Sequence, residues 1–367
     1  MTPCGSHNDC DDDCAVHVPG TNRRRFMAAS DDHHAALDRQ TGPFDTLTAA
    51  LGGLFVGHCL GSVARFSVAD ALDDTPRTAQ ELADVTGANP EALGRVLRLL
   101  AAHGVFAASD DRFTHTDASR MLRADHPQSW RDFVATFGTE RTAQHLGYFD
   151  YSLQTGLPAT KRLNPDGFFA ILASDPEAGR AFDAAMVSKS RIQVASVLAA
   201  YDFSDCGTIA DIGGGHGHLL RAVVDAAERT TGILFDLPPV IERAAEIASD
   251  RLTPQAGDFF EDPLPVCDTY LLMDVIHDWD VERATAILAA VRKAAPPHAR
   301  LLLVESVIPD DPGPDWSKAM DIMMLIHTGG RQRTRSEHET LLQTCGFRLE
   351  RVVATTSDVS ILEAVCA

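Results

Sequence analysis

The segment Asp211-Ile-Gly213-Gly214-Gly215-His216-Gly217 decides the fold of this 367-residue chain. Residues 208–212 form a short apolar run typical of a buried strand, and a helical pattern begins directly after the last glycine. Glycines let the backbone of such a strand-to-helix turn adopt positive φ and approach a ligand closely. The free amides at the helix start favour a polar or anionic group. The segment therefore predicts a ligand-binding turn at the end of the first strand of a sheet.

Strands and helices alternate between this segment and the C-terminus. We expect strands at residues 208–212, 233–235, 269–276, 300–304, 348–354 and 359–365. Helical stretches such as 218–227 and 281–294 separate the earlier strands, which predicts a doubly wound α/β sheet. The last two strands are joined by only four residues, so we expect them to form an antiparallel hairpin at the edge of the sheet.

The first half of the chain has helical patterns instead. Apolar residues recur at helical spacing over residues 44–72. Thr78-Ala-Gln-Glu81 has the form of a capping box, and Asn89-Pro90 predicts the start of a second helix. Two short β-prone pieces follow, and the combination predicts a winged-helix unit. Residues 126–205 are expected to be mainly helical.

The winged-helix unit lacks the charge of a DNA-binding domain. Residues 77–125 contain six arginines, no lysine and seven acidic residues, and the second helix offers only Arg95 and Arg98 beside Glu91. A DNA-recognition helix needs a basic face. We expect this unit to pack against other elements or to dimerise.

Composition restricts the partners and the compartment. The 32 basic and 52 acidic residues give a formal net charge of −20, which repels phosphate backbones and anionic lipid surfaces. We therefore expect no nucleic-acid and no membrane partner, and no apolar run long enough to span a membrane. The N-terminus lacks the pattern of a signal peptide, and several cysteines stand singly in apolar stretches, so a reducing cytoplasm is the expected location.

The length of the chain indicates two domains. We expect a disordered tail at residues 1–40, the winged-helix unit with its linker helices at 41–195, and the sheet domain at 196–367. The tail has few large apolar side chains and cannot bury enough surface to fold. Its cysteines and histidines lack the paired spacing of common zinc modules, so we expect no metal site.

Acidic residues at three strand ends describe the ligand. Asp211 precedes the turn that holds Gly213 and Gly215, and it suits a ligand with an ammonium group, which a pyrophosphate lacks. The spacing G-x-G-x-G also differs from the G-x-G-x-x-G of dinucleotide sites. Asp236 ends the next strand, where a carboxylate can accept both hydroxyls of a ribose. The third strand position is followed by Asp258-Phe259, a polar contact and an aromatic wall for a purine. This order indicates S-adenosylmethionine as the cofactor.

With these motifs the chain resembles the small-molecule O-methyltransferases, which include plant caffeate and flavonoid enzymes and bacterial antibiotic-tailoring relatives. The resemblance runs from about residue 43 to the C-terminus, and its most specific pieces are residues 211–217, 236–239, 257–260, 277–279 and 329–334. It implies a Rossmann-like class I methyltransferase domain and an N-terminal winged-helix domain that forms a homodimer. The cofactor contacts that it implies are Ser190, Gly213, Asp236, Asp258 and Phe259.

His277 is the candidate general base. It lies just beyond the apolar strand, and ligands of open α/β sheets bind beyond the carboxyl ends of the strands. A phenol with a pKa of about 10 is a poor nucleophile until its proton is removed, and a neutral imidazole can accept that proton. Asp278 and Trp279 are expected to cap and pack the following helix.

The resemblance implies two glutamates that flank this histidine and stabilise its protonated form. The first matches Glu305, but the second falls at Gln332, which carries no charge. A further departure is Met273, at a cofactor position near the adenine where many relatives have a lysine. With one carboxylate fewer, we expect a less basic imidazole. The acceptor would then be a relatively acidic phenol, or catalysis would depend more on proximity.

The resemblance also implies an acceptor pocket between the two domains. The positions that match its lining are Phe182, Met186, Ile322, Met323 and His327. Methionines adapt to flat aromatic molecules, and His327 adds a polar contact. The methionines of residues 320–324 recur at helical spacing, so they are equally consistent with ordinary core packing.

Taken together, these features predict a homodimeric O-methyltransferase that methylates a hydroxyl of a small aromatic or polyketide-type metabolite. Two alternatives stay open: methylation of nitrogen or carbon on the same fold, and a protein that binds S-adenosylmethionine without transferring its methyl group. The substitutions at Met273 and Gln332 would permit the second alternative. A DNA-binding regulator is weaker because the winged-helix unit is not basic.

Overall fold

The computed structural model describes residues 42–367, so the predicted tail and its cysteines and histidines lie outside the described residues. The chain divides into two units, Met1–Leu54 and Phe55–Ala367. The described part of the first unit is the beginning of helix α2 (Pro43–Arg65). The domain boundaries predicted from the sequence, after residues 40 and 195, stay predictions.

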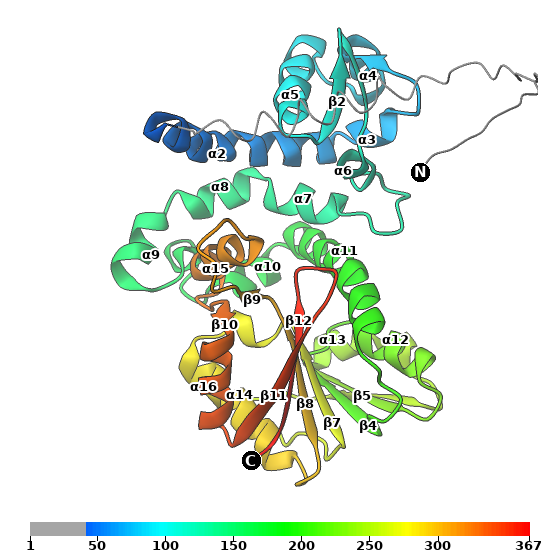
Figure 1. Cartoon of the computed structure of the whole chain (residues 1–367), viewed down its shortest axis with the longest axis vertical. Helices are drawn as coiled ribbons and strands as arrows, with labels where there is room; N and C mark the ends of the chain where they lie inside the picture. The colour runs from blue at the N-terminus through cyan, green and yellow to red at the C-terminus, as the bar shows by residue number, and fades with distance from the viewer. Residues whose placement is uncertain (1–41) are drawn as a thin grey trace, which may run out of the picture. The chain divides into compact units, whose positions relative to one another are not determined.

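Apart from the short strand β1, the winged-helix elements occur where the sequence predicts them (Figure 1). They are α3 (Val68–Ala71), β1 (Arg77–Thr78), α4 (Ala79–Thr86), α5 (Pro90–Ala102), β2 (Phe106–Ser109) and β3 (Arg112–His115). The capping box is present, because the Thr78 hydroxyl accepts from the backbone N–H of Glu81 and the Glu81 carboxylate accepts from that of Thr78. Strand β1 pairs with β3 and was not predicted, since two residues carry no periodicity.

The segment that follows is helical, as expected. Its elements are α6 (Asp117–Arg120), α7 (Arg131–Phe137), α8 (Glu140–Leu146), α9 (Phe149–Thr155), the 3-10 turn η1 (Ala159–Arg162), α10 (Phe168–Ser174) and α11 (Pro176–Ala200). Helix α11 packs along α7 and leads into the first strand of the large sheet. Its Pro176 stands at the first helical position and Asp175 caps it, which fixes where this long helix begins.

The large sheet confirms the doubly wound prediction. Its strands are β4 (Thr208–Ile212), β5 (Thr231–Asp236), β6 (Leu252–Ala256), β7 (Thr269–Met273), β8 (Arg300–Glu305), β11 (Phe347–Ala354) and β12 (Ser360–Cys366). Their order is β11-β12-β8-β7-β4-β5-β6. Neighbours from β8 to β6 are parallel, whereas β12 pairs antiparallel with β8 and with the edge strand β11, which confirms the predicted hairpin.

Helices and short elements complete this part of the chain (Figure 1). They are α12 (His218–Ala226), α13 (Pro238–Arg243), η2 (Ala245–Ile247), η3 (Ile276–Asp278), α14 (Val281–Ala294), β9 (Val307–Ile308), α15 (Trp316–His327), β10 (Arg333–Thr334) and α16 (Arg335–Thr344). Strand β8 shows why the sheet is buried on both faces. Leu301 and Leu303 belong to one apolar cluster, while Leu302 and Val304 belong to the other.

Strand β7 is shorter than predicted, because it ends at Met273 and not at residue 276. The next residue, Asp274, has a φ of 55°, which an extended strand cannot continue. The backbone N–H groups of Val275 and Ile276 then donate to the carboxylate of Glu305 at 3.2 and 2.8 Å instead of to a neighbouring strand. A side chain on the adjacent strand therefore ends β7, and hydropathy alone could not reveal this.

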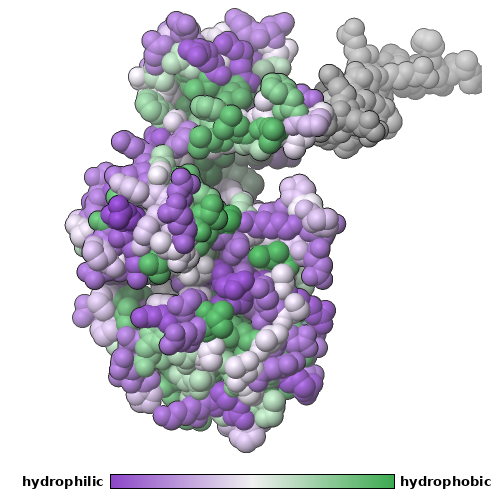
Figure 2. All heavy atoms as spheres, turned by 90° about the vertical axis from the view of Figure 1, so that its left-hand side faces the viewer, coloured by the Kyte–Doolittle hydropathy of each residue, from purple (hydrophilic) through white to green (hydrophobic). Residues whose placement is uncertain are grey.

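Helix α2 corrects the expectation that no segment could span a membrane. The helix has 23 residues, and the mean hydropathy of an 18-residue stretch within it is 1.6, so it is long and apolar enough to span a membrane by length and composition alone. Small alanines and glycines separate its large apolar residues, and for that reason the sequence shows no unbroken run. Several of those residues are exposed: Phe44, Leu47, Leu51, Leu54 and Phe55. Figure 2 shows that apolar residues reach the surface of the molecule in several places.

The five cysteines among the described residues are free, as the sequence predicts. They are Cys59, Cys206, Cys267, Cys345 and Cys366. Burial raises the pKa of the thiols of Cys206 and Cys267, which keeps them protonated and unreactive. These side chains serve as small apolar groups in the core.

Two glycines of α2 provide a test of its packing. A Cβ atom on Gly61 would overlap the backbone of Gly138, whereas one on Gly57 would meet no atom within 4 Å. We expect Gly61→Ala to lower the free energy of unfolding by about 1–3 kcal/mol, because the two backbones must separate. Gly57→Ala is the matched control and should be neutral or stabilising by up to about 1 kcal/mol, because alanine favours helix. Urea unfolding of both variants at one protein concentration would check this, and equal effects would contradict it.

Candidate active site

The glycine turn joins β4 to α12 and has the backbone conformation that its sequence predicts. Gly213, Gly215 and Gly217 have φ values of 70°, 59° and 70°. A Cβ atom on Gly214 would collide with the side chain of Asp211, but one on Gly215 would meet no atom within 4 Å. The turn is therefore packed against the sheet at Gly214 and open at Gly215, where a ligand can approach the backbone.

A cavity of about 310 Å³ lies against this turn. The predicted cofactor residues that line it are Ser190, Asp211, Gly213, Gly215, Asp236 and Met273. Phe182 and Met186, predicted for the acceptor, line it as well. The other two predicted cofactor residues, Asp258 and Phe259, are not among its lining residues. Phe259 lies against Gly213 and packs edge-on to Trp279.

Two carboxyl groups in this cavity differ in their partners. Asp236 accepts hydrogen bonds from the backbone N–H groups of Gly215 at 2.8 Å and Leu237 at 2.7 Å. Asp211 is 2% exposed, and its Oδ1 has no hydrogen-bond partner among residues 42–367. Burial, together with the negative charge of Asp236, raises the pKa of Asp211 to about 7. A buried acid without a partner is costly, so this atom is suited to a cationic or hydrogen-bond-donating ligand.

His277 and Glu305 come together at the ends of β7 and β8. Glu305 is 1% exposed and is the next inward residue after Leu301 and Leu303 on the same face of β8. Its Oε2 accepts a hydrogen bond of 2.7 Å from His277 Nδ1, while Oε1 holds the turn after β7. The Nε2 atom of His277 lies 3.9 Å from Oδ1 of Asp278, a residue of the cavity lining, whereas His277 itself is not among the lining residues of this cavity.

The imidazole of His277 is more basic than that of an ordinary histidine. Burial opposes its protonation, but the carboxylates of Glu305, Asp278 and Asp274 outweigh burial and raise the pKa of His277 to about 9. The Oδ1 atom of Asp274 lies 3.6 Å from Nδ1. Asp274 and Asp278 thus supply negative charge beside the imidazole, and the effect of the substitution at Gln332 on its basicity stays a prediction.

Gln332 does not take the place of a second orienting glutamate in the described structure. Its side chain is 2% exposed, and neither amide atom has a hydrogen-bond partner among the described residues. Its backbone N–H donates to Asp321 at 2.9 Å. Its side chain is therefore buried next to α15 without a bond to His277.

The expectation for Asp278 is also wrong. Asp280, not Asp278, is the N-cap of α14, and its carboxylate accepts from the backbone N–H of Arg283. Asp278 instead belongs to the turn η3 and lines the cavity of about 310 Å³ beside the glycine turn, called the cofactor cavity below. Trp279 packs against Phe259 and Phe260, as a packing role requires.

Asp274, His277 and Glu305 could hold a metal ion by distance alone, since their ligand atoms lie within 4.8 Å of one another. Both Glu305 oxygens already accept hydrogen bonds. The ammonium of Lys189 lies 2.9 Å from Asp274 and would repel a second cation. The absence of a metal site stays a prediction.

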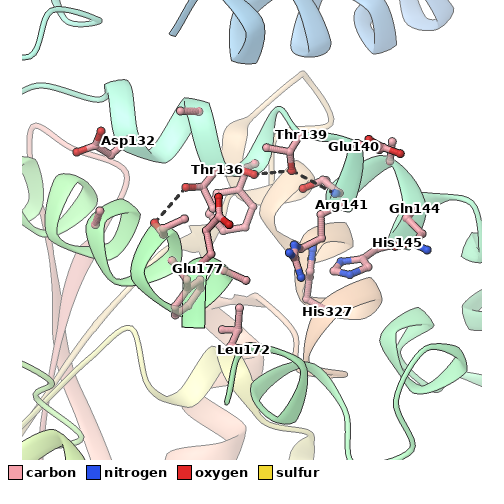
Figure 3. Close-up of a pocket in the computed structure, with 18 of the residues that line it drawn as sticks. Asp132, Thr136, Thr139, Glu140, Arg141, Gln144, His145, Leu172, Glu177 and His327 are labelled. Carbon is pink, nitrogen blue, oxygen red and sulfur yellow. Dashed lines mark hydrogen bonds between the residues drawn. The ribbon is translucent and has the colours of Figure 1, made fainter. Parts of the chain in front are cut away.

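A second cavity, of about 840 Å³, lies among α7, α8, α10, α11 and α15 (Figure 3). Phe182 and His327 line it, as predicted for the acceptor, whereas Ile322 and Met323 line neither cavity. His145 and Phe168 were not predicted, although their rings lie 5.0 and 5.1 Å from that of His327. One histidine among fifteen, on a short helix, gives no sequence signal that would identify it.

The two imidazoles of this cavity are neutral. Burial lowers the pKa of both His145 and His327 to about 4. His327 Nδ1 donates to the carbonyl oxygen of Met323 at 2.8 Å, which leaves its Nε2 as a hydrogen-bond acceptor. In Figure 3 the side chains of His145, His327 and Arg141 converge on one side of the cavity.

A doubly wound sheet whose glycine turn and strand-end acids border one cavity, with a histidine–glutamate pair beside it, defines a Rossmann-like enzyme domain for a nucleoside-containing cofactor. Two family models match the chain: an O-methyltransferase domain at residues 148–348 and an O-methyltransferase dimerisation domain at residues 49–125. The chain belongs to this family of S-adenosylmethionine-dependent methyltransferases.

Known relatives cover nearly the whole chain. Phenazine O-methyltransferase PhzM of Lysobacter antibioticus is 37% identical over 326 residues, which are 87% of this chain and 95% of that protein. The 8-amino-8-demethylriboflavin N,N-dimethyltransferase of Streptomyces davaonensis is 35% identical over 305 residues, 80% of this chain and 87% of that protein. The crystal structure of CalO1, a methyltransferase in calicheamicin biosynthesis in its SAH-bound form, matches with a TM-score of 0.79 and 32% identity. This match covers 94% of this chain and 100% of that one.

S-adenosylmethionine is thus the cofactor, and the residues of the smaller cavity fit it. The unpartnered Oδ1 of Asp211 and the open space at Gly215 are the two features of this structure that suit such a ligand. Asp236 stands at the end of β5, as required for a ribose contact. The individual contacts of Ser190, Asp258, Phe259 and Met273 stay predictions.

The unpaired acid predicts how cofactor binding depends on pH. Because the pKa of Asp211 is raised to about 7, most of this group is protonated at pH 6, and a cationic ligand binds better to the carboxylate. We expect the affinity for S-adenosylmethionine to increase several-fold from pH 6 to 7.5. Asp211→Asn should bind more weakly and lose this dependence. Isothermal titration calorimetry would measure both, and the same pH dependence in Asp211→Asn would rule out this group.

Proposed function

We propose that this methyltransferase methylates a hydroxyl group of a small aromatic or polyketide-derived molecule, with His277 as the general base. The observation that carries the proposal is the hydrogen bond between His277 Nδ1 and Glu305, which engages Nδ1 and leaves Nε2 outside this pair. Asp278, the neighbour of Nε2, lines the cofactor cavity. A base held in this way suits an oxygen nucleophile that must lose a proton.

In this mechanism the bound cofactor supplies an electrophilic methyl group on a positively charged sulfonium. His277 Nε2 accepts the proton of the acceptor hydroxyl. Glu305 keeps the proton on Nδ1 and stabilises the imidazolium that forms. Because the sulfonium loses its charge in the reaction, the rest of the protein contributes alignment and a dry site. Asp278 would orient the acceptor hydroxyl beside Nε2.

The larger cavity is the proposed acceptor pocket. Phe182 lines both cavities, so the acceptor and the cofactor would meet at its ring. The loop after α15 connects the pocket to the base, because Arg331 donates a backbone hydrogen bond of 2.8 Å to the carbonyl of His277. A Cβ atom on Gly330 would overlap this same backbone, so the loop requires glycine there. Met186, Ile322 and Met323 stay proposed contacts.

The same proposal includes a homodimer in the cytoplasm, without nucleic acid or membrane. The match to a dimerisation domain at residues 49–125 supports self-association. The exposed apolar side chains of α2 would be covered by a second copy of the chain, and burial of such residues favours association. The hydropathy of α2 is then a property of an interface.

Nitrogen methylation is the second candidate. The relative named as an N,N-dimethyltransferase, at 35% identity, favours keeping it. An amine with a free lone pair can attack a methyl group without prior loss of a proton, so a base would matter little. The response to loss of His277 therefore separates the two candidates.

We expect His277→Ala to lower kcat by about 10²–10⁴-fold on a phenolic acceptor while the affinity for S-adenosylmethionine barely changes. In the wild type, kcat/KM should rise with pH and level off near pH 9, because only the neutral imidazole accepts a proton and the pKa of His277 is about 9. The variant His277→Ala should lose this rise of kcat/KM with pH. Methyl transfer to a panel of phenols and amines, followed by mass spectrometry, would measure both. Near-normal turnover of phenols by His277→Ala would exclude a role of His277 in deprotonation. Methyl transfer to amines but not to phenols would favour nitrogen methylation.

His327→Phe tests the acceptor pocket. The variant keeps an aromatic ring but loses the Nε2 lone pair, so acceptors with a second hydroxyl should lose about one hydrogen bond, or roughly five- to tenfold in KM. Matched acceptors that lack the second hydroxyl should be unaffected, as should the KM for the cofactor. Equal effects on both acceptor classes would mean that His327 supports the fold and does not read the acceptor.

A further inference from the structure

Lys189 carries a buried charge that the mechanism above does not use. It lies in the middle of α11, is 8% exposed and lines the cofactor cavity. Its Nζ lies 2.9 Å from Oδ1 of Asp274. Among residues 42–367 it makes no other ion pair. A buried ammonium is costly unless it is paired, so this contact is required for Lys189 to occupy its place.

Asp274 lies between this ammonium and the imidazole of His277. Its backbone has a φ of 55°, which is rare for a residue with a side chain. Its N–H donates to the carbonyl of Val304 at 3.0 Å, so the turn is tied to β8. The same Oδ1 that contacts Lys189 is 3.6 Å from His277 Nδ1. Strained backbone of this kind is maintained where the surrounding structure demands it, often at functional sites.

His277 is faced by charges from several elements. Glu305 approaches from β8, and Asp274 and Asp278 approach from its own turn. Lys189 contributes from α11. Arg333, from β10, donates to the carbonyl of Ile276 at 3.0 Å. His338, from α16, is buried without hydrogen bonds among the described residues, and burial lowers its pKa to about 4, so it is neutral. Three carboxylates thus face two cations around one imidazole.

We propose that Lys189 is a positioning residue for His277, because its ion pair holds the Asp274 carboxylate away from the imidazole. Without this pair, Asp274 would compete with Glu305 for the proton on Nδ1 and would add its full negative charge to the site. The proposal rests on the role of His277 as the base. It concerns the free enzyme, in which all of these groups are already in place.

Lys189 cannot serve as the base itself. Burial lowers its pKa, but the carboxylates of Asp274 and Asp358 outweigh burial and raise it above its usual value. It remains an ammonium over the pH range in which the enzyme would act. Its effect on the reaction must therefore pass through Asp274 and the protonation of His277.

The test compares four variants with the wild type. Lys189→Met keeps an unbranched apolar side chain, one atom shorter, and removes the charge; Asp274→Asn removes the opposite charge; the double variant removes both; and Lys189→Arg keeps the charge. The pKa of His277 would be measured in the free enzyme by NMR, with histidine labelled in the ring and His277→Ala used to assign the signal. The pH profile of kcat/KM on a phenolic acceptor would be measured in parallel.

We expect Lys189→Met to raise the pKa of His277 by about one unit, because an unpaired carboxylate then stands beside the imidazole. At pH 7 this leaves about tenfold less neutral imidazole, and activity should recover at high pH. Asp274→Asn should lower the pKa by a similar amount, because the unpaired ammonium remains. In the double variant the two shifts should largely cancel. Lys189→Arg, which keeps the charge, should stay near the wild type.

Three results would overturn the proposal. One is a lower kcat for Lys189→Met with an unchanged pKa, which indicates a structural role alone. Another is a loss of S-adenosylmethionine affinity in calorimetry without a change at His277, which assigns Lys189 to the cofactor. The third is a pKa in the double variant that equals that of Lys189→Met. If Lys189→Met does not fold, Asp274→Asn should still lower the pKa of His277, and the double variant should still return this pKa to near the wild-type value. The NMR measurement needs no substrate, so it tests the role of Lys189 independently of the reaction. Failure of the proposed O-methylation would show instead as near-normal turnover of His277→Ala.

Discussion

The hydrogen bond between Glu305 and His277 is the contact on which the active site depends. A carboxylate at the end of β8 holds the imidazole, and it also accepts the two backbone N–H groups that β7 no longer pairs. Three donors from one turn therefore converge on one buried side chain. Loss of that side chain would leave buried polar groups without partners, each at a cost of about 1–3 kcal/mol. The position of His277 and the end of the strand are one structural feature.

The site concentrates negative charge in a protein that is already strongly acidic. Asp211, Asp236, Asp274, Asp278 and Glu305 all lie at the carboxyl edge of the parallel sheet. Burial raises the pKa of Asp211 to about 7. Burial, together with neighbouring acids, raises the pKa of Asp278 to about 6. Such a group of acids is stable only with cations nearby. Lys189 supplies one of them from α11, and the positively charged cofactor is suited to supply another.

Much of this could be predicted because strand ends are visible in the sequence. Asp211, Asp236, His277 and Glu305 each follow an apolar run, and parallel strands bring their carboxyl ends to one edge. Hydrophobic periodicity also predicted the winged-helix unit and the terminal hairpin. The errors occur where a local pattern was overruled by a contact from elsewhere. Val275 and Ile276 are apolar enough to continue a strand, but Glu305 binds their backbone N–H groups.

The sequence by itself determined the fold and the glycine turn, and it singled out His277 as the proposed base, because these depend on periodicity and on residue types at strand ends. The tertiary structure decided which charges surround His277. Asp274 and Lys189 are 85 positions apart, and no spacing rule relates a helix to a turn at that distance. The same holds for His145 and His327, whose rings meet at 5.0 Å from two different helices. Electrostatic effects depend on distance in space and on burial, and the folded chain alone sets both.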